Sequence, residues 1–334
     1  MKKNRNGGGF EKVSDGNSLE CSLAGMWMRT PIITASGTFG YGEEYTRLRN
    51  FDIESIGAIV LKSVTRFPRQ GNPPPRFVET AAGIINSIGL QNVGVEALIA
   101  NELPKMRQYK TNIVVSIAGN SVEEYDEMSF LLKDTDDYEA IEVNISCPNV
   151  EKQGMLFSFD PKSAGVVTET VKKHIKSKPV IMKLSPNAPD LVATAIACSK
   201  AGADVISLVN TFSALAIDIE KRRPILRRNF GGLSGPAIKP IALAMVCRVA
   251  TAFKVQKMDT AVIGMGGILT WEDAIQYILC GASAIAVGTG IFYNPAVIKE
   301  IANGMRKYCE TNEQKISDVV GSLKLYSDSD SQFC

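Results

Sequence analysis

Histidine is nearly absent from this chain. Its 334 residues include one histidine, His174, in the run VKKHIKSK. This run is typical of the solvated face of a helix, so we expect His174 to be inert. Catalysis by a Ser–His or Cys–His pair is therefore not expected, and any catalytic base should be a residue of another type.

Cysteine clusters and strong charge are also lacking. The seven cysteines include no CxxC pair, and their spacing suggests neither a zinc site nor an iron–sulfur cluster. An odd, scattered set in a chain of this length indicates reduced thiols and a cytoplasmic protein. The formal net charge of +2 predicts no nucleic-acid or membrane partner. No apolar run is long enough to span a bilayer, and the opening MKKNRNGGGF has no apolar segment typical of a signal peptide.

Short β-branched runs alternate with segments of helical length along the chain. Most of the β-branched runs are continuously apolar, as expected of parallel strands with both faces covered. Eight strand–helix units without a clear linker predict an α/β protein, a single (β/α)8 barrel, with a doubly wound sheet as the alternative. We predict strands over residues 32–34, 58–62, 112–117, 140–144, 179–184, 204–209, 261–263 and 284–287. Helices are predicted, for example, over residues 122–132, 163–175, 189–201, 236–253 and 271–280.

Three stretches interrupt the alternation. Residues 67–78 contain four prolines and cannot be helical, residues 85–92 follow them, and residues 211–235 end in GGLSG. Long loops in a compact barrel usually cover or bind a ligand. The barrel is expected to span residues 19–308, after a flexible lead over residues 1–18. Residues 309–334 are then a C-terminal extension, and its end after residue 326 should be disordered.

Polar residues gather where the predicted strands end. In a barrel of this type the C-terminal strand ends carry the chemistry. A lone lysine there is more often a structural ion pair than a catalyst. Two lysines, two asparagines and a cysteine at the ends of successive strands instead indicate a cationic pocket for an anionic planar ligand and a cofactor. These strand ends carry Ser36, Lys62, Ser63, Ser116, Asn144, Ser146, Cys147, Lys183, Asn210 and Thr211.

The stretch AIEVNISCPN, residues 140–149, supplies the candidate base. Cys147 lies in a turn closed by Pro148, just beyond the predicted end of a buried strand. A thiol can act as a general base once its pKa is tuned. An isolated cysteine in such a loop would more often be a buried apolar residue. The polar residues at the neighbouring strand ends favour the catalytic interpretation.

Glycine turns follow the last two predicted strands. Gly266 and Gly267 precede a helix that Thr270 caps, with Asp273 three residues on, and Gly288-Thr289-Gly290 precedes another helix. Backbone N–H groups at such positions commonly hold a phosphate in barrels. One GMGG run could be only a tight turn. Two such elements favour a phosphorylated cofactor, and flavin mononucleotide (FMN) fits, with Lys183 near its ring system.

With these motifs together, the sequence resembles the class 1 dihydroorotate dehydrogenases, most closely the 1B subclass. The resemblance covers roughly residues 19–308. It implies a (β/α)8 barrel with FMN at the C-terminal mouth that oxidises (S)-dihydroorotate to orotate in pyrimidine biosynthesis. The motifs that carry it are ASGTFGYGEE, LKSVT, NSIGLQN, NISCPN, MKLSPN, NTFSALAID, GGLSGPAIKP, GMGGI and VGTG.

The resemblance also implies roles for individual residues. Cys147 would remove the C5 proton of dihydroorotate while C6 delivers a hydride to flavin N5. Ser116 stands where relatives often carry asparagine, and Gln153-Gly154 stands where a Gly-Gly pair is common. The implied FMN contacts are Ser36, Lys62, Ser63, Ser116, Asn144, Lys183, Val209, Gly235, Gly266, Gly267, Gly288 and Thr289. The implied substrate contacts are Lys62, Asn86, Ser87, Ile88, Gly89, Leu90, Asn144, Asn149, Asn210 and Thr211.

A 1B enzyme further implies a partner chain. The chain is expected to form a homodimer, or a heterotetramer with a subunit that carries FAD and a [2Fe–2S] cluster. This sequence has neither the cysteine spacing for such a cluster nor a GxGxxG motif after a strand. The equipment would therefore lie on another polypeptide.

Three other functions remain open. A homodimer of the 1A kind would pass electrons to fumarate. A dihydropyrimidine dehydrogenase-like reductase would act on uracil or thymine. A phosphate-binding aldolase or isomerase would use Lys62 or Lys183 as a Schiff-base lysine, and it would be colourless, whereas a flavoprotein is yellow.

Overall fold

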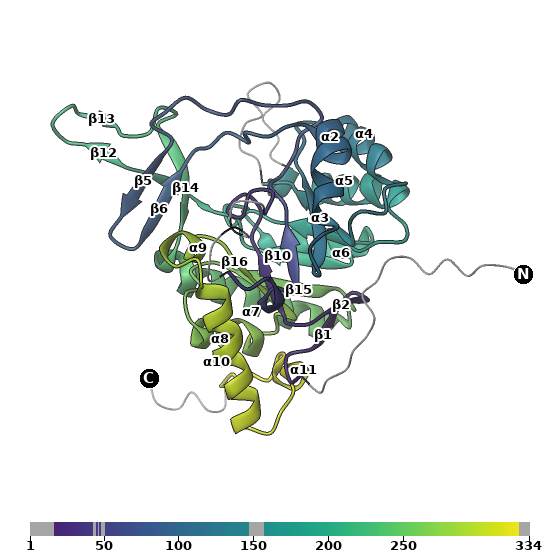
Figure 1. The fold of residues 1–334 in the computed structure, drawn as a ribbon. Helices are drawn as coiled ribbons and strands as arrows, with labels where there is room; N and C mark the ends of the chain where they lie inside the picture. The colour runs from purple at the N-terminus through teal and green to yellow at the C-terminus, as the bar shows by residue number, and fades with distance from the viewer. Residues whose placement is uncertain (1–16, 43–44, 46, 48–50, 147–156, 327–334) are drawn as a thin grey trace, which may run out of the picture.

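Eight parallel strands close into a barrel at the centre of the protein (Figure 1). The structure is a computed structural model that describes residues 17–42, 45, 47, 51–146 and 157–326. Each barrel strand pairs with the next one along the chain, and the last pairs with the first. The (β/α)8 prediction is confirmed, and the doubly wound alternative is wrong. The barrel strands are β3 (Ile32–Thr34), β4 (Ala58–Val60), β7 (Asn112–Ile117), β8 (Ala140–Asn144), β9 (Val180–Lys183), β10 (Val205–Leu208), β15 (Ala261–Met265) and β16 (Ala284–Val287).

Alternate residues of each strand face the barrel interior. Ile33, Val114 and Ala286 belong to an inner apolar cluster, whereas their neighbours along the strands pack against the helices. This alternation follows from the two-residue repeat of a β-strand. The hairpin of β1 (Cys21–Leu23) and β2 (Met26–Met28) adds Leu23, Met26 and Met28 to the same inner cluster. By the same alternation Ser116, Glu142 and Lys183 also point inward, so the interior becomes polar toward the C-terminal strand ends.

Helices surround the barrel, and the predicted helices are confirmed to within three residues at their ends. The predicted helix over residues 236–253 begins instead as a 3₁₀ turn, and α7 then continues to Gln256. It ends where Lys257 adopts a left-handed conformation. The α-helices are α2 (Val95–Ala97), α3 (Leu103–Met106), α4 (Val122–Leu132), α5 (Pro161–His174), α6 (Leu191–Lys200), α7 (Lys239–Gln256), α8 (Trp271–Leu279), α9 (Gly290–Tyr293), α10 (Val297–Thr311) and α11 (Ile316–Val319). The 3₁₀ turns are η1 (Ile53–Ser55), η3 (Phe157–Phe159) and η4 (Pro236–Ile238), and η2 (Leu98–Glu102) is a π-helical segment between α2 and α3.

A second sheet projects from the barrel at the upper left of Figure 1. Its order is β11 (Phe212–Leu215), β14 (Phe230–Ser234), β6 (Gly83–Asn86) and β5 (Phe77–Thr80). The short pair β12 (Ile217–Asp218) and β13 (Arg223–Pro224) extends it. The sequence predicted loops over residues 67–78 and 211–235, and that prediction is wrong where these residues pair in β5, β11, β12, β13 and β14. The strands form because segments about 146 positions apart meet, with Asn86 opposite Gly232, and local patterns do not reveal such pairings.

The two ends of the described chain meet at the base of the barrel. The backbone N–H of Ile316 donates to the carbonyl oxygen of Ser18 at 2.9 Å, and both Ile316 and Val319 are buried. Helix α10 continues through residues 308 and 309, so the predicted start of the extension lies inside a helix. The lead up to residue 16 and the tail after residue 326 lie outside the described residues. Among the described helices, none combines the length and the apolar character that crossing a bilayer requires.

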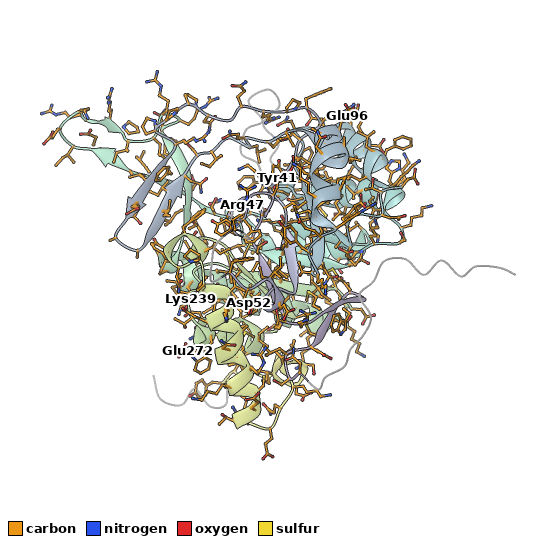
Figure 2. The ribbon with its side chains drawn as sticks, in the orientation of Figure 1. Tyr41, Arg47, Asp52, Glu96, Lys239 and Glu272 are labelled. Carbon is orange, nitrogen blue, oxygen red and sulfur yellow. The ribbon has the colours of Figure 1, made fainter. Side chains whose placement is uncertain are left out.

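The start of α8 shows how local sequence chemistry fixes a helix. Thr270 and Asp273 form the predicted capping box, and Asp273 also accepts from the backbone N–H of Leu269 at 2.9 Å. The ammonium of Lys239, labelled with Glu272 in Figure 2, pairs with the same carboxylate. Burial acts to raise the pKa of Asp273, but these hydrogen bonds outweigh it, so the pKa lies below its ordinary value.

We expect Asp273→Asn to reduce the free energy of unfolding by about 1–2 kcal/mol at pH 7, because a cap and an ion pair are lost together. A carboxyl with a lowered folded-state pKa stabilises the fold above its unfolded pKa of about 3.9. That stability is lost as the pH falls through the folded pKa, so the difference between parent and variant should shrink in acid. Urea unfolding at pH 7 and at lower pH measures this. Glu272→Gln, an exposed change in the same turn, is the control, and an equal loss in both variants would contradict the assignment.

Candidate active site

A chain of polar side chains crosses the barrel interior beneath its C-terminal mouth. Lys183, at the end of β9, donates to the hydroxyl of Ser36 at 2.9 Å, and its ammonium lies 3.9 Å from the carboxylate of Glu142. The same carboxylate accepts from Ser116 at 2.9 Å, and the Ser116 hydroxyl lies 2.8 Å from that of Ser63. Four residues predicted to contact a cofactor are therefore joined in one network.

Glu142 is the member of this network that sequence reasoning missed. It lies in the middle of β8, inside a run read as an apolar strand, and its side chain is 2% exposed. An acidic residue within a buried strand could have indicated it, because such a residue needs a buried cation or hydrogen-bond donors to pair with. Lys183, itself only 4% exposed, supplies that cation.

Asn144 and Asn210 meet at the ends of β8 and β10. The Asn210 amide donates to the Asn144 side-chain oxygen at 3.3 Å, and the backbone N–H of Ser146 donates to that oxygen at 3.1 Å. The Tyr125 hydroxyl, from α4, donates to the Asn144 carbonyl oxygen at 2.8 Å. Asn210 also accepts from the backbone N–H of Thr211 at 2.8 Å. Two of the predicted substrate-binding amides are thus in contact and held from several elements.

The NSIGLQN motif follows β6 on the second sheet. The Asn86 amide donates to the Gly232 carbonyl oxygen at 3.3 Å. Gly232 in turn lies against Thr211, because a Cβ built on it would meet the Thr211 hydroxyl oxygen at 2.0 Å. This contact connects the start of the motif to the end of β10. The second sheet therefore carries one group of predicted substrate residues toward another.

Two asparagines outside the predicted site hold the rest of the motif. The Asn72 side chain donates to the Ser87 carbonyl oxygen at 2.8 Å, and its backbone N–H donates to the Ile88 carbonyl oxygen at 2.9 Å. Asn92 donates to the Leu90 carbonyl oxygen at 2.6 Å. Gly89 and Leu90 both have positive φ, at 77° and 53°. Such a turn is stable only when its surroundings fix it, which is the role we assign to these asparagines.

The glycine turns present unbonded backbone donors at the ends of β15 and β16. Across the described ranges, the N–H groups of Gly266, Gly267, Gly288 and Thr289 have no hydrogen-bond acceptor. Gly267 has φ +67°, and a Cβ there would meet the Gly235 carbonyl oxygen at 2.8 Å. The fold alone thus requires glycine at that position. At Gly288 a Cβ would meet nothing closer than 3.4 Å, so the fold alone does not require glycine there. These donors fit a phosphate group.

The remaining predicted positions lie around the same mouth. The backbone N–H of Lys62, just after β4, donates to the Gly40 carbonyl oxygen at 2.9 Å. Val209 follows β10 and donates its N–H to the Met265 carbonyl oxygen at 3.2 Å, which places it beside Gly266. The Thr289 hydroxyl donates to that of Ser234, the neighbour of Gly235, at 2.8 Å. Cys147, Asn149 and Gln153 lie outside the described residues, so their roles stay predictions.

Other cysteine thiols of the described chain are poorly suited to act as bases. Burial raises the pKa of Cys21 to about 12 and that of Cys198 to about 11. Burial and the neighbouring Cys247 raise the pKa of Cys280 to about 11. A thiol with such a pKa is almost fully protonated at neutral pH. None of these three thiols is therefore a candidate for the base, which stays assigned to Cys147.

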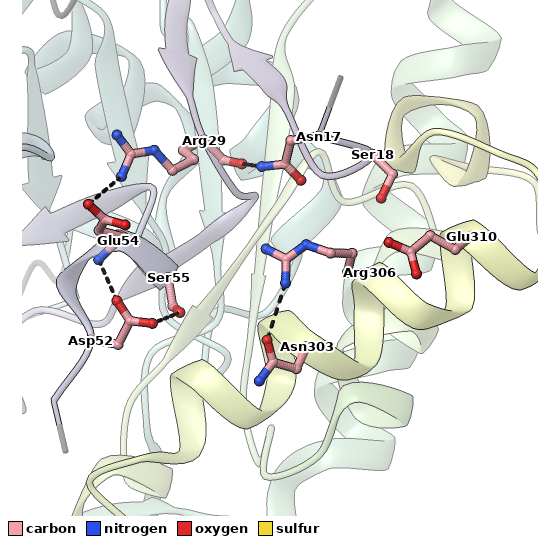
Figure 3. A pocket seen from close by; sticks show the side chains of 9 residues that line it. All are labelled: Asn17, Ser18, Arg29, Asp52, Glu54, Ser55, Asn303, Arg306 and Glu310. Carbon is pink, nitrogen blue, oxygen red and sulfur yellow. Dashed lines mark hydrogen bonds and ion pairs between the residues drawn. The ribbon is translucent and has the colours of Figure 1, made fainter. Parts of the chain in front are cut away.

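A polar pocket at the other end of the barrel is separate from these residues. It lies beside the segments that precede β3 and β4 and beside α10 (Figure 3). Its charged groups are partly compensated, since Arg29 lies 3.8 Å from Glu54 and Arg306 donates to Asn303 at 3.2 Å. None of the predicted site residues lines it. The C-terminal mouth is the candidate active site.

A closed (β/α)8 barrel with polar residues at its C-terminal mouth defines the molecule as a barrel enzyme. A family model described as dihydroorotate dehydrogenase matches residues 18–308. The chain belongs to this family. Membership implies a flavin cofactor, and the residues at the mouth fit one in their chemistry, because they include a buried lysine and a set of unbonded backbone N–H groups.

The relatives are similar over nearly their whole length. The chain is 47% identical over 308 residues to a protein of Geobacter sp. (strain M21), covering 92% of this chain and 98% of that relative. It is 48% identical over 309 residues to one of Caldicellulosiruptor bescii, covering 92% and 100%. It is 47% identical over 309 residues to one of Desulforamulus reducens, covering 92% and 99%. All three are named dihydroorotate dehydrogenase B (NAD(+)), catalytic subunit.

We expect Gly288→Ala to fold normally but to purify with less flavin. The added methyl would make only ordinary contact, with Ala35 at 3.4 Å and Thr38 at 3.8 Å, yet it would stand beside the unbonded N–H groups. Flavin absorbance per chain and circular dichroism measure the two properties. Gly165→Ala, in α5 with no contact closer than 3.8 Å, is the matched control and should keep full flavin. Equal flavin content in both variants would remove Gly288 from the cradle.

Proposed function

We propose that this chain is the catalytic subunit of an NAD-linked dihydroorotate dehydrogenase of class 1B, which binds FMN and oxidises (S)-dihydroorotate to orotate in pyrimidine biosynthesis. The observation that carries the proposal is the identity of 46–48% to catalytic subunits of that name over 98–100% of their length. The geometry of the mouth supports it, since cationic and amide groups converge there. A cytoplasmic location stays a prediction.

The cofactor is FMN in this proposal. When bound, FMN accepts the hydride from C6 of the substrate. Lys183 and Ser36 face its ring from β9 and from the end of β3, and Ser63 faces it from the end of β4. The N–H groups of Gly266, Gly267, Gly288 and Thr289 hold its phosphate. Ser116 donates its hydroxyl hydrogen to Glu142, so it can accept a hydrogen bond from Ser63 and hold that side chain in place.

The substrate is held by the amides and by Lys62. Orotate is a planar anion with amide-like edges, and an asparagine side chain presents a donor and an acceptor side by side. Asn144 and Asn210 come from the barrel, whereas Asn86 and the turn through Leu90 come from the second sheet. Lys62 offsets the substrate carboxylate. That carboxylate also separates this function from a uracil or thymine reductase, because uracil lacks the group that the lysine pairs with.

An aldolase or isomerase with Lys183 as a Schiff-base lysine is less well supported. A Schiff-base lysine must reach the neutral amine, yet the Lys183 ammonium donates to Ser36 and lies 3.9 Å from the Glu142 carboxylate. The amine nitrogen is thus engaged by two neighbouring side chains and is not free to attack a carbonyl group. A visible spectrum of the purified protein tests the choice directly, because a flavoprotein is yellow and an aldolase is colourless.

Cys147→Ala should leave FMN bound and slow flavin reduction by dihydroorotate roughly 10²–10⁴-fold, the range typical of a positioned base. Stopped-flow absorbance of the flavin measures the rate. Cys147→Ser should keep some activity at higher pH, because a hydroxyl is a weaker acid than a thiol. Cys280→Ser is the control and should reduce flavin at the parent rate. Reduction at the parent rate in Cys147→Ala would show that another group is the base.

The proposed partner is a second polypeptide that carries FAD and a [2Fe–2S] cluster, docked on a homodimer of this chain. The relatives are named catalytic subunits, which implies that they work with another subunit. We expect the chain purified alone to oxidise dihydroorotate with an artificial dye acceptor, but with neither NAD nor fumarate. Steady-state assays with each acceptor decide this. Rapid turnover with fumarate would instead indicate a self-sufficient 1A enzyme.

A further inference from the structure

Glu142 occupies a position that the proposed reaction does not use directly. It lies in β8, two residues before Asn144, so both side chains face the barrel interior. Its carboxylate is buried and pairs with Lys183 on one side and with Ser116 on the other. Within the described part of the chain, no other carboxylate comes within 4.0 Å of the Lys183 ammonium.

We propose that Glu142 is a positioning residue that fixes both the charge and the hydrogen-bond polarity of the side chains facing the flavin. This inference rests on the flavin site proposed above. Glu142 acts through Lys183 and through the Ser116–Ser63 pair, and it touches neither cofactor nor substrate.

The first count concerns the two serines. An ionised carboxylate only accepts hydrogen bonds, so the single hydroxyl hydrogen of Ser116 is committed to Glu142. Ser116 must then accept from Ser63, whose oxygen lies 2.8 Å away. The one hydrogen of Ser63 is therefore committed as well. Toward the mouth, Ser63 can present only lone pairs, and it can accept from an N–H group of the flavin but cannot donate.

The second count concerns Lys183 and Ser36. An ammonium has three hydrogens. One is donated to Ser36 at 2.9 Å and one faces Glu142, which leaves one for the mouth. Ser36 accepts from the lysine, so its own hydrogen stays available as a donor. Glu142 thereby leaves Ser63 as an acceptor and Lys183 and Ser36 as donors at the flavin site.

The buried charge makes Glu142 necessary for this arrangement. An ammonium that is 4% exposed loses most of its hydration, and removing its counter-charge leaves an uncompensated buried ion. Replacing both partners by neutral residues removes that cost. The pair therefore predicts non-additive effects on FMN binding, whereas a purely structural ion pair would be non-additive in stability alone.

The test is a double-mutant cycle of Glu142→Gln and Lys183→Met, read out as the dissociation constant of FMN. Each apoprotein is titrated with FMN, whose fluorescence is quenched on binding. Glu142→Gln alone should weaken FMN binding on the order of tenfold, the middle of the range for contacting charged pairs. In the Lys183→Met background the same change should weaken binding by clearly less, because only the contribution through Ser116 and Ser63 then remains. Thermal unfolding of the four proteins should show the double variant more stable than Glu142→Gln.

Ser207→Ala is the matched control. Ser207 lies on β10 in register with Lys183, and its buried hydroxyl has no hydrogen-bond partner among the described residues. This variant should bind FMN as the parent does. If Glu142→Gln does not fold, Lys183→Met is compared with the double variant, and a further loss of about tenfold or more between them would show that Glu142 does not act through the lysine.

Two results overturn the inference. One is parent-like FMN binding by Glu142→Gln, and the other is an equal loss with and without Lys183. The flavin proposal fails separately, since it requires that the parent apoprotein bind FMN at all.

Discussion

The structure depends on keeping a lysine ammonium inside a closed barrel. Lys183 is almost fully buried, on an inner face that in the lower layers is lined by Ile33, Val114 and Ala286. Such a charge is tolerated only when a counter-charge and hydrogen-bond acceptors surround it. Glu142 supplies the counter-charge from β8, and Ser36 supplies an acceptor from the turn after β3. The polar mouth is therefore built from the barrel's own register, which brings Asn144 beside Lys183 and Glu142 beside Ser116.

The second sheet contributes further polar groups to the mouth. In the proposed function the planar anion is held by groups at the barrel strand ends and by groups on the second sheet. The pairing of β14 with β6 carries the Asn86 turn toward Thr211. That turn contains two residues at positive φ, one of them Leu90, and it is held by Asn72 and Asn92. Strain at a non-glycine residue is typical of functional turns whose surroundings over-determine them.

Much of the fold could be predicted from the sequence, and the reason is local. Most barrel strands are largely apolar runs, and the Thr270–Asp273 capping box signals its helix directly. The second sheet could not be predicted, because its strands are short, half-exposed and paired across about 146 residues. For the site, the sequence predicts that polar residues gather at the strand ends. Ser36, Ser63, Ser116 and Lys183 are indeed joined through Glu142 in one network of hydrogen bonds and an ion pair. The pairing of Glu142 with Lys183 and Ser116 could not be predicted, because it depends on the strand register and on which face of β8 the side chain occupies.

The register also explains why serine at position 116 is more than a shortened asparagine. An asparagine amide would offer both a donor and an acceptor, so it could bond Glu142 while leaving the direction of the Ser63 hydrogen open. A serine has one hydrogen, and the carboxylate takes it. The Ser63 hydrogen then has one direction, toward Ser116. A single short side chain thus converts a buried negative charge into a defined acceptor at the mouth, two residues away from the charge itself.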